Sequence, residues 1–206
     1  MNLPRLYPIL DTETAARRGI EPVAAAAQIL EGGARILQFR HKGFWSREVF
    51  GVMQRVAELC AKAGVQFVVN DRADLARLMG AALHLGQDDI PPSAARKVVG
   101  DLPIGFSTHN EAQLRAAGEE PADYLALGPI FGTGSKMNPD PVVGVDELRR
   151  LRPLTNKPLV AIGGITRANA RSVIEAGADS VAVIGDCFPE NCDIAERIRE
   201  WIELLR

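Results

Sequence analysis

The chain has 206 residues, 47% of them hydrophobic, and a formal net charge of −2. This length suits one sizeable core, and this composition is that of a globular protein rather than a disordered one. The charge balance provides no basic surface for nucleic acid or an anionic membrane, and no apolar run is long enough to cross a bilayer. Because no signal-peptide pattern follows Met1, we expect a cytoplasmic protein.

Short apolar runs of strand length alternate with helical patterns from one end of the chain to the other. Runs rich in Val, Ile, Leu and aromatic residues predict eight strands, over residues 6–10, 36–40, 67–70, 82–85, 104–107, 124–128, 159–162 and 180–184. The clearest helices are predicted over residues 46–63 and 193–205, where apolar residues recur at a spacing of three to four. Eight strands and about eight helices predict an α/β protein, a (β/α)₈ TIM barrel in which residues 1–206 form a single domain.

Glycines and capping residues predict where the helices begin and end. Thr166 and Ser46 are predicted as helix N-caps, Pro22 lies near a first turn, and a further helix is expected to start near Asn110. Five glycines follow helical stretches and are predicted to be left-handed C-terminal residues: Gly32, Gly64, Gly80, Gly118 and Gly177.

Polar residues gather where the second strand ends. Strand alternation places Ile36, Gln38 and Arg40 on one face, and Leu37 and Phe39 on the face that suits the outer helices. Gln38 and Arg40 are therefore predicted to point into the barrel mouth, where the active site of such a barrel lies. An arginine in this position requires an anionic partner.

Carboxylates follow the third and fourth strands. Asp71 comes directly after the third strand, and Asp88 and Asp89 follow the fourth. Each could be a helix cap or a turn residue, but acidic groups at the ends of adjacent strands can share one cation. Mg²⁺ takes one or two protein carboxylates and completes its coordination with water and substrate phosphate oxygens. With Arg40 and Lys42 nearby, this pattern predicts a metal–diphosphate site.

Glycine-rich segments follow the last three strands. The segment from Gly128 to Lys136 combines small residues, hydroxyls and a lysine, and glycines also follow the seventh and eighth strands at Gly163 and Gly185. Barrels often bind phosphate through backbone N–H groups at these positions. The three histidines match no metal-binding spacing, and His84, inside a strand, is predicted to be a hydrogen-bonded interior residue.

These strand ends resemble the thiamine phosphate synthase family over nearly the whole chain, from about Leu6 to Phe188. Each motif is weak alone, but six in order are specific. The matching segments are Gln38-Phe39-Arg40-His41-Lys42, Asn70-Asp71-Arg72, His84-Leu85-Gly86-Gln87-Asp88-Asp89, Gly105-Phe106-Ser107-Thr108-His109, Gly128 to Lys136, and Ile162-Gly163-Gly164-Ile165.

The resemblance implies a role for each of these positions. The residues implied to bind the aminopyrimidine diphosphate are Gln38, Arg40, Lys42, Asn70, Ser107 and Lys136, with Arg40, Lys42 and Lys136 as the catalytic cations. Asp71 and Asp89 are implied to hold Mg²⁺. The residues implied to bind the thiazole phosphate are Thr133, Gly134, Ser135, Gly163, Ile184 and Gly185.

The chain departs from the family pattern in three places. His41 replaces an acidic residue, Ser135 replaces a threonine, and Gly185 stands where the family usually has serine. The first removes a negative charge beside Lys42, and the second keeps the hydroxyl. The third removes one hydroxyl from the expected phosphate site and leaves only backbone donors there.

The resemblance implies small-molecule partners and a Mg²⁺-dependent transfer, which joins 4-amino-5-hydroxymethyl-2-methylpyrimidine diphosphate to a thiazole phosphate, carboxylated or not. Diphosphate leaves, and the thiazole nitrogen captures the pyrimidine cation. Two alternatives share the barrel. A thiazole tautomerase would place a histidine after the sixth strand's glycine, where this chain has Pro129. A non-catalytic thiazole-phosphate-binding barrel would be indicated by loss of Asp71 or Lys136, and both are present. The sequence does not give the oligomeric state.

Overall fold

The computed structural model describes residues 3–132, 140–188 and 193–206, and its strands form a closed parallel barrel. Strands pair in chain order, and β8 pairs with β1 to close the ring. Each observed strand differs from its predicted range by at most one residue at either end, so the predicted barrel is confirmed. The strands are β1 (Leu6–Asp11), β2 (Ile36–Arg40), β3 (Gln66–Asn70), β4 (Ala82–Leu85), β5 (Ile104–Thr108), β6 (Tyr124–Leu127), β7 (Leu159–Ile162) and β8 (Ser180–Val183).

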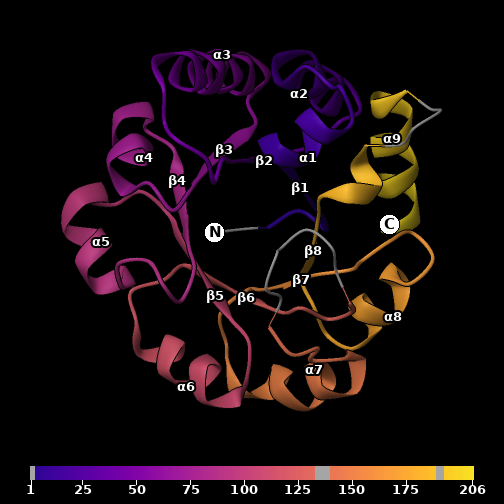
Figure 1. Cartoon of the computed structure of the whole chain (residues 1–206). Helices are drawn as coiled ribbons and strands as arrows, with labels where there is room; N and C mark the ends of the chain where they lie inside the picture. The colour runs from indigo at the N-terminus through magenta and orange to yellow at the C-terminus, as the bar shows by residue number, and fades with distance from the viewer. Residues whose placement is uncertain (1–2, 133–139, 189–192) are drawn as a thin grey trace.

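Helices surround the strands as an outer ring (Figure 1). They are α1 (Thr12–Arg17), α2 (Pro22–Glu31), α3 (Arg47–Ala63), α4 (Ala73–Met79), α5 (Pro92–Val99), α6 (Glu111–Glu119), α7 (Val145–Leu151), α8 (Ala170–Glu175) and α9 (Ile194–Leu204), with short 3₁₀ turns η1 (Arg152–Leu154) and η2 (Gly185–Cys187). Among the helices in the described ranges, none combines the length and the apolar character that crossing a membrane requires.

Most of the predicted helix starts are confirmed. The Ser46 side chain accepts from the Val49 N–H at the start of α3, and the Asn110 side chain accepts from the Gln113 N–H at the start of α6. The prediction for Thr166 was wrong, because Asn169 is the N-cap of α8. The Asn169 side chain instead accepts from the Thr166 N–H at 2.8 Å, so Thr166 opens a turn before the helix.

Two of the five predicted left-handed glycines do not take that conformation. Gly32 is right-handed with φ −66°, and the next residue, Gly33, carries the positive φ of 95°. Gly118 lies inside α6, which continues to Glu119. The other three, Gly64, Gly80 and Gly177, have φ of 66°, 62° and 105°. A glycine near a helix end therefore indicated the end only to within one or two residues.

Two apolar clusters explain why the polar residues collect at one end. The larger lies between strands and helices and contains Leu37 and Phe39, as strand alternation predicts. The smaller fills the barrel interior and contains Ile36, Val68 and Val160. Because the apolar residues fill the interior, the inward-facing residues nearest the carboxyl ends of the strands line the mouth.

Candidate active site

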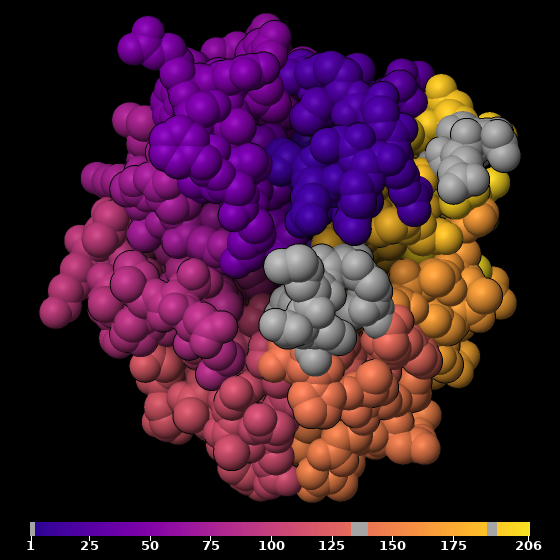
Figure 2. Space-filling model, viewed as in Figure 1, coloured from indigo at the N-terminus to yellow at the C-terminus, as the bar shows by residue number. Residues whose placement is uncertain are grey.

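A cavity of about 560 Å³ opens at the carboxyl ends of the strands. Figure 2 shows this face in space-filling form, hollowed near its centre where segments from both halves of the chain meet. All the predicted site residues that the structure describes line this one cavity: Gln38, Arg40, Lys42, Asn70, Asp71, Asp89, Ser107, Gly163, Ile184 and Gly185. Thr133, Gly134, Ser135 and Lys136 lie outside the described residues.

Arg40 reaches the mouth with an anionic partner already in place. Its guanidinium donates to the carboxylate of Asp11, the residue directly opposite in the β1–β2 register. Asp11 is 1% exposed, and its other oxygen accepts from the Thr14 N–H at 2.8 Å, which caps α1. Sequence reasoning missed Asp11, although alternation along β1 from Ile9 places it inward at a strand end. The carboxylate holds Arg40 in one orientation, at the edge of the cavity.

A lysine and two carboxylates gather beside Arg40. Lys42 Nζ lies 2.5 Å from Asp71 Oδ2, and Asp89 interacts with Asp71 directly. Burial raises the pKa of the Asp71 carboxyl and the neighbouring Asp89 adds to this, while Lys42 opposes both. Asp89 is itself fixed by the Gly86 N–H, which donates to its carboxylate at 2.7 Å. Two adjacent carboxylates, of which only Asp71 is paired with a lysine, favour binding of further positive charge.

The backbone of Asp71 has an uncommon conformation. Its φ is 64°, the only positive φ at a non-glycine residue in the described ranges, and its N–H donates to the His84 carbonyl at 2.8 Å. A non-glycine residue held in the left-handed region costs energy, and such residues cluster at functional sites. The hydrogen bond to β4 thus keeps the Asp71 carboxylate directed towards Asp89.

The two carboxylates fit the ligand set that Mg²⁺ uses. In the part of the chain that the structure describes, no group of three or more His, Cys, Asp or Glu side chains could enclose a metal ion. That arrangement excludes an all-protein cage among these residues. It suits a cation that keeps several waters and binds substrate phosphate oxygens. Asp71 and Asp89 as metal ligands remain a prediction.

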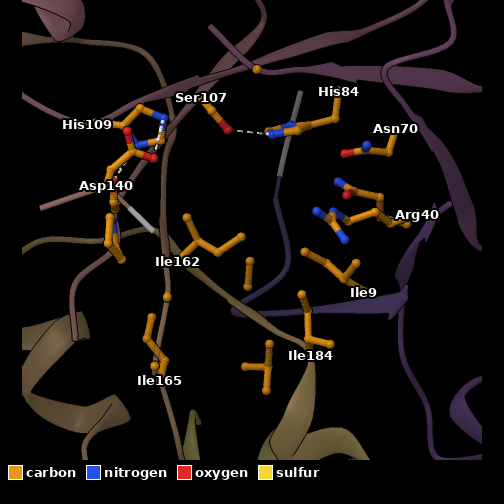
Figure 3. A pocket seen from close by; sticks show the side chains of 18 of the residues that line it. Ile9, Arg40, Asn70, His84, Ser107, His109, Asp140, Ile162, Ile165 and Ile184 are labelled. Atoms are coloured by element: carbon orange, nitrogen blue, oxygen red, sulfur yellow. Dashed lines mark hydrogen bonds and ion pairs between the residues drawn. The ribbon is translucent and has the colours of Figure 1, made fainter. Parts of the chain in front are cut away.

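Asn70 brings an unpaired donor to the cavity. Its side chain is 6% exposed, and its Nδ2 atom is buried without a hydrogen-bond partner among the described residues. A buried amide N–H group without an acceptor is costly, so its presence beside Arg40 points to an acceptor on a ligand. Figure 3 shows Arg40, Asn70, His84 and Ser107 along one side of the pocket, across from Ile162, Ile165 and Ile184.

His41, the residue that departs from the family pattern, supports the loop after β2. Its Nδ1 lies 2.7 Å from the Thr12 hydroxyl, and its Nε2 lies 3.1 Å from the Phe44 carbonyl oxygen. Because a carbonyl only accepts, Nε2 carries a proton and donates to Phe44, and in the neutral ring Nδ1 then accepts from the Thr12 hydroxyl. The ring also packs edge-on against Trp45, with centroids 5.2 Å apart. His41 therefore holds the loop that carries Lys42.

Glycine backbone forms the opposite side. Gly163 has φ 98°, and a Cβ there would lie 2.5 Å from Pro129 Cβ; Gly164 has φ 63°, and a Cβ there would lie 2.5 Å from the Gly132 carbonyl oxygen. Only glycine allows the chain after β7 to approach the chain after β6 this closely. Gly185 differs, because its φ is not positive and its carbonyl accepts from Arg18 Nη1 at 3.0 Å.

The chain is similar in sequence and in structure to known proteins of one family. A family model described as thiamine monophosphate synthase matches residues 6–187. A thiamine-phosphate synthase of Koribacter versatilis is 49% identical over 212 residues, covering 100% of this chain and 97% of the relative. One from Chloroflexus aurantiacus is 40% identical over 181 residues, covering 87% and 83%. The solved thiamine phosphate pyrophosphorylase from Pyrococcus furiosus superposes with a TM-score of 0.87 at 31% identity, covering 99% of this chain and 96% of that one.

Proposed function

Because the chain belongs to the thiamine monophosphate synthase family, we propose that its barrel mouth joins an aminopyrimidine methyl diphosphate to a thiazole phosphate, with release of diphosphate. Relatives named thiamine-phosphate synthase, which align over 87% to 100% of this chain, support a transferase of thiamine biosynthesis. The observation that carries the proposal is the placing of Arg40, Lys42 and the Asp71–Asp89 pair in one cavity with a glycine-lined wall opposite. The cations suit a diphosphate, and the glycine backbone suits a single phosphate.

The charged side would bind and neutralise the leaving group. Arg40 and Lys42 would contact the diphosphate oxygens, with Lys136, outside the described residues, as a third cation. Asn70 would donate its unpaired N–H. Asp71 and Asp89 would hold Mg²⁺, which when bound supplies positive charge to the diphosphate. Lys42, now paired with Asp71, would then be free to turn to the phosphate oxygens.

The glycine side would hold the second substrate. Backbone N–H groups after β7 and β8, at Gly163 and Gly185, would donate to the thiazole phosphate beside Ile184. Thr133, Gly134 and Ser135, outside the described residues, would add hydroxyl and backbone donors. Tight packing of Gly163 against Pro129 fixes this wall before the ligand arrives, so binding requires little reorganisation.

The proposed transfer breaks one bond and forms one bond, and it needs no oxidant or reductant. The bond between the pyrimidine methylene carbon and the diphosphate oxygen breaks, and its electron pair leaves with the diphosphate. The thiazole nitrogen gives its lone pair to that carbon, and a C–N bond forms. Ile9, close to Arg40, and Ile162 and Ile184, on the opposite side, line the cavity, where they would keep water away from the electron-poor carbon.

Incubation with both substrates and Mg²⁺, followed by chromatographic detection of thiamine phosphate, tests the proposal. We expect product only when both substrates are present. Rearrangement of the thiazole without coupling would assign the tautomerase alternative. Binding of thiazole phosphate with no turnover of either substrate would assign the non-catalytic barrel.

A further inference from the structure

Five polar side chains form a continuous hydrogen-bonded path across the barrel interior. Gln38 Nε2 donates to the Tyr7 hydroxyl at 3.0 Å, and the Tyr7 and Tyr124 hydroxyls are 2.8 Å apart. The Tyr124 hydroxyl lies 3.0 Å from His84 Nδ1, and His84 Nε2 lies 2.9 Å from Ser107 Oγ. The path begins and ends at residues that line the cavity, Gln38 on β2 and Ser107 on β5.

The middle of this path is buried and closely packed. Tyr7 and Tyr124 are 1% and 0% exposed. Gly105, opposite Tyr124 in the β5–β6 register, leaves the space for its ring, since a Cβ at Gly105 would lie 2.1 Å from Tyr124 Cζ. The Tyr124 ring also stacks on His84 at a centroid distance of 5.7 Å. The two phenols are therefore fixed in place by their surroundings rather than by solvent.

The chemistry of each group gives the path one direction. An amide nitrogen only donates, so the Tyr7 oxygen accepts from Gln38. If Tyr124 also donated to Tyr7, the buried Tyr7 O–H would have no acceptor among the described residues, so Tyr7 donates to Tyr124. Burial raises the pKa of both phenols, that of Tyr7 to about 12, so each keeps its single proton.

The remaining two steps follow from Tyr124. Its O–H donates to His84 Nδ1, which must then be the nitrogen without a proton. The neutral imidazole carries its hydrogen on Nε2 and donates it to Ser107 Oγ. The Ser107 O–H is thereby left to point away from His84, towards the cavity that Ser107 lines.

We propose that Tyr7, Tyr124 and His84 are positioning residues, a one-way hydrogen-bonded chain that sets the two polar ends of the substrate site. At one end Gln38 keeps its Nε2 on Tyr7 and offers its carbonyl oxygen, an acceptor for an amino group on a heteroaromatic ring. At the other end Ser107 offers a hydroxyl donor, suited to a phosphate oxygen. The assignment of these ends to the pyrimidine diphosphate rests on the function proposed above, but the direction of the chain does not.

The first test determines the direction of the hydrogen bonds in this chain and needs no substrate. Protein labelled with ¹⁵N at histidine, studied by NMR at mildly alkaline pH, reports which ring nitrogen of His84 holds the proton, with the signal assigned by a His84→Gln variant. We expect the Nε2–H tautomer in the wild type and loss of that preference in Tyr124→Phe. An Nδ1–H tautomer in the wild type, or an unchanged tautomer in Tyr124→Phe, overturns the chain, whatever reaction the protein catalyses.

The second test measures how this hydrogen-bonded chain affects recognition of the pyrimidine ring. Binding of unreactive phosphonate analogues carrying either a 4-amino or a 4-oxo pyrimidine is measured by calorimetry for wild type, Tyr7→Phe and Thr108→Val. Thr108 is the matched control, because it is adjacent to Ser107 and its buried hydroxyl donates to the Ala126 carbonyl at 2.9 Å. It takes no part in the hydrogen-bonded path from Gln38 to Ser107. In Tyr7→Phe, the Gln38 amide loses the acceptor that fixes its orientation.

We expect the wild type and Thr108→Val to prefer the amino analogue equally. Tyr7→Phe should reduce that preference by roughly two- to tenfold, the value of one neutral hydrogen bond. An equal loss for both analogues, or the same loss in Thr108→Val, would mean that Tyr7 only supports packing and would overturn the proposal. Melting temperatures of the three proteins show whether each variant is folded, and His84 tautomers in the same samples give the independent readout.

Discussion

The ends of β1 to β5 and the ends of β6 to β8 face each other across the cavity, and they offer different groups to a ligand. The first side presents charged side chains that neutralise one another in the free protein, Arg40 with Asp11 and Lys42 with Asp71. The second side presents backbone at Gly163 and Gly164, packed too closely for any side chain. Charge on the first side can be redistributed when an anion arrives, whereas the second side is fixed by steric contact. Substitutions on the two sides should therefore fail in different ways.

The largest effect is expected on the charged side, from Asp71→Asn. Losing one of the two carboxylates should lower kcat/KM by about 10²–10³, typical of removing one electrostatic contact to the transition state. Steady-state kinetics with Mg²⁺ titrated over a wide range checks this. Asp88→Asn, a neighbouring carboxylate without an implied role, is the control and should retain full activity. Wild-type turnover by Asp71→Asn, or in excess EDTA, would contradict the metal assignment.

A second substitution on the charged side, Asp11→Asn, should also impair the protein, because it removes the charge that orients Arg40. The amide oxygen can still cap α1, so the loss falls on the contact to Arg40, worth about 1.5–3 kcal/mol in unfolding free energy. KM for the pyrimidine diphosphate should rise, because Arg40 is no longer held in one orientation. Denaturant unfolding and kinetics measure the two effects. Glu31→Gln is the control, since its pair with Arg199 is exposed and should contribute almost nothing. Equal stability of Asp11→Asn and wild type would show that Arg40 is oriented by something else.

On the glycine side, Gly163→Ala should act through the backbone. A Cβ there would lie 2.5 Å from Pro129 Cβ at a residue with φ 98°, so unfolding free energy should fall by about 1–3 kcal/mol. KM for thiazole phosphate should rise more than KM for the diphosphate. Gly118→Ala, inside α6 with open space around it, should instead stabilise by about 0.5–1 kcal/mol. A Gly163→Ala protein as stable as the wild type would contradict the close packing.

How far the sequence predicted this molecule depended on whether a feature was local. Strands such as β2 and β7 were predicted to the residue because polar residues, proline or glycine bound them in the chain itself. Asp11 and the two tyrosines were missed, because their significance lies in pairing across strands: Asp11 with Arg40, and Tyr7 with Tyr124 over a separation of 117 residues. Positions such as Asp71 and Gly163 were selected by their place at strand ends, and the structure brings them into one cavity.

The smallest effect is expected from Gly185→Ser, which adds a side chain to the glycine side. The nearest atom to a Cβ at Gly185 is Arg18 Nη2, at 3.8 Å, and the backbone there is not left-handed, so serine fits without strain. Gly185→Ser should tighten thiazole phosphate binding by about tenfold through one charge-assisted hydrogen bond, and leave diphosphate binding unchanged. Calorimetric titration with each ligand decides it. Unchanged affinity for thiazole phosphate would mean that this phosphate does not bind beside β8.

The coupling reaction itself, followed by quantifying both products in one sample, tests the central claim most directly. With both substrates and Mg²⁺ present, thiamine phosphate and diphosphate should appear in equal amounts. Asp71→Asn should slow both together while still binding thiazole phosphate as the wild type does. Diphosphate released without thiamine phosphate, or no product from the wild type with both substrates bound, would contradict the assignment of the two sides to the two substrates of one transfer.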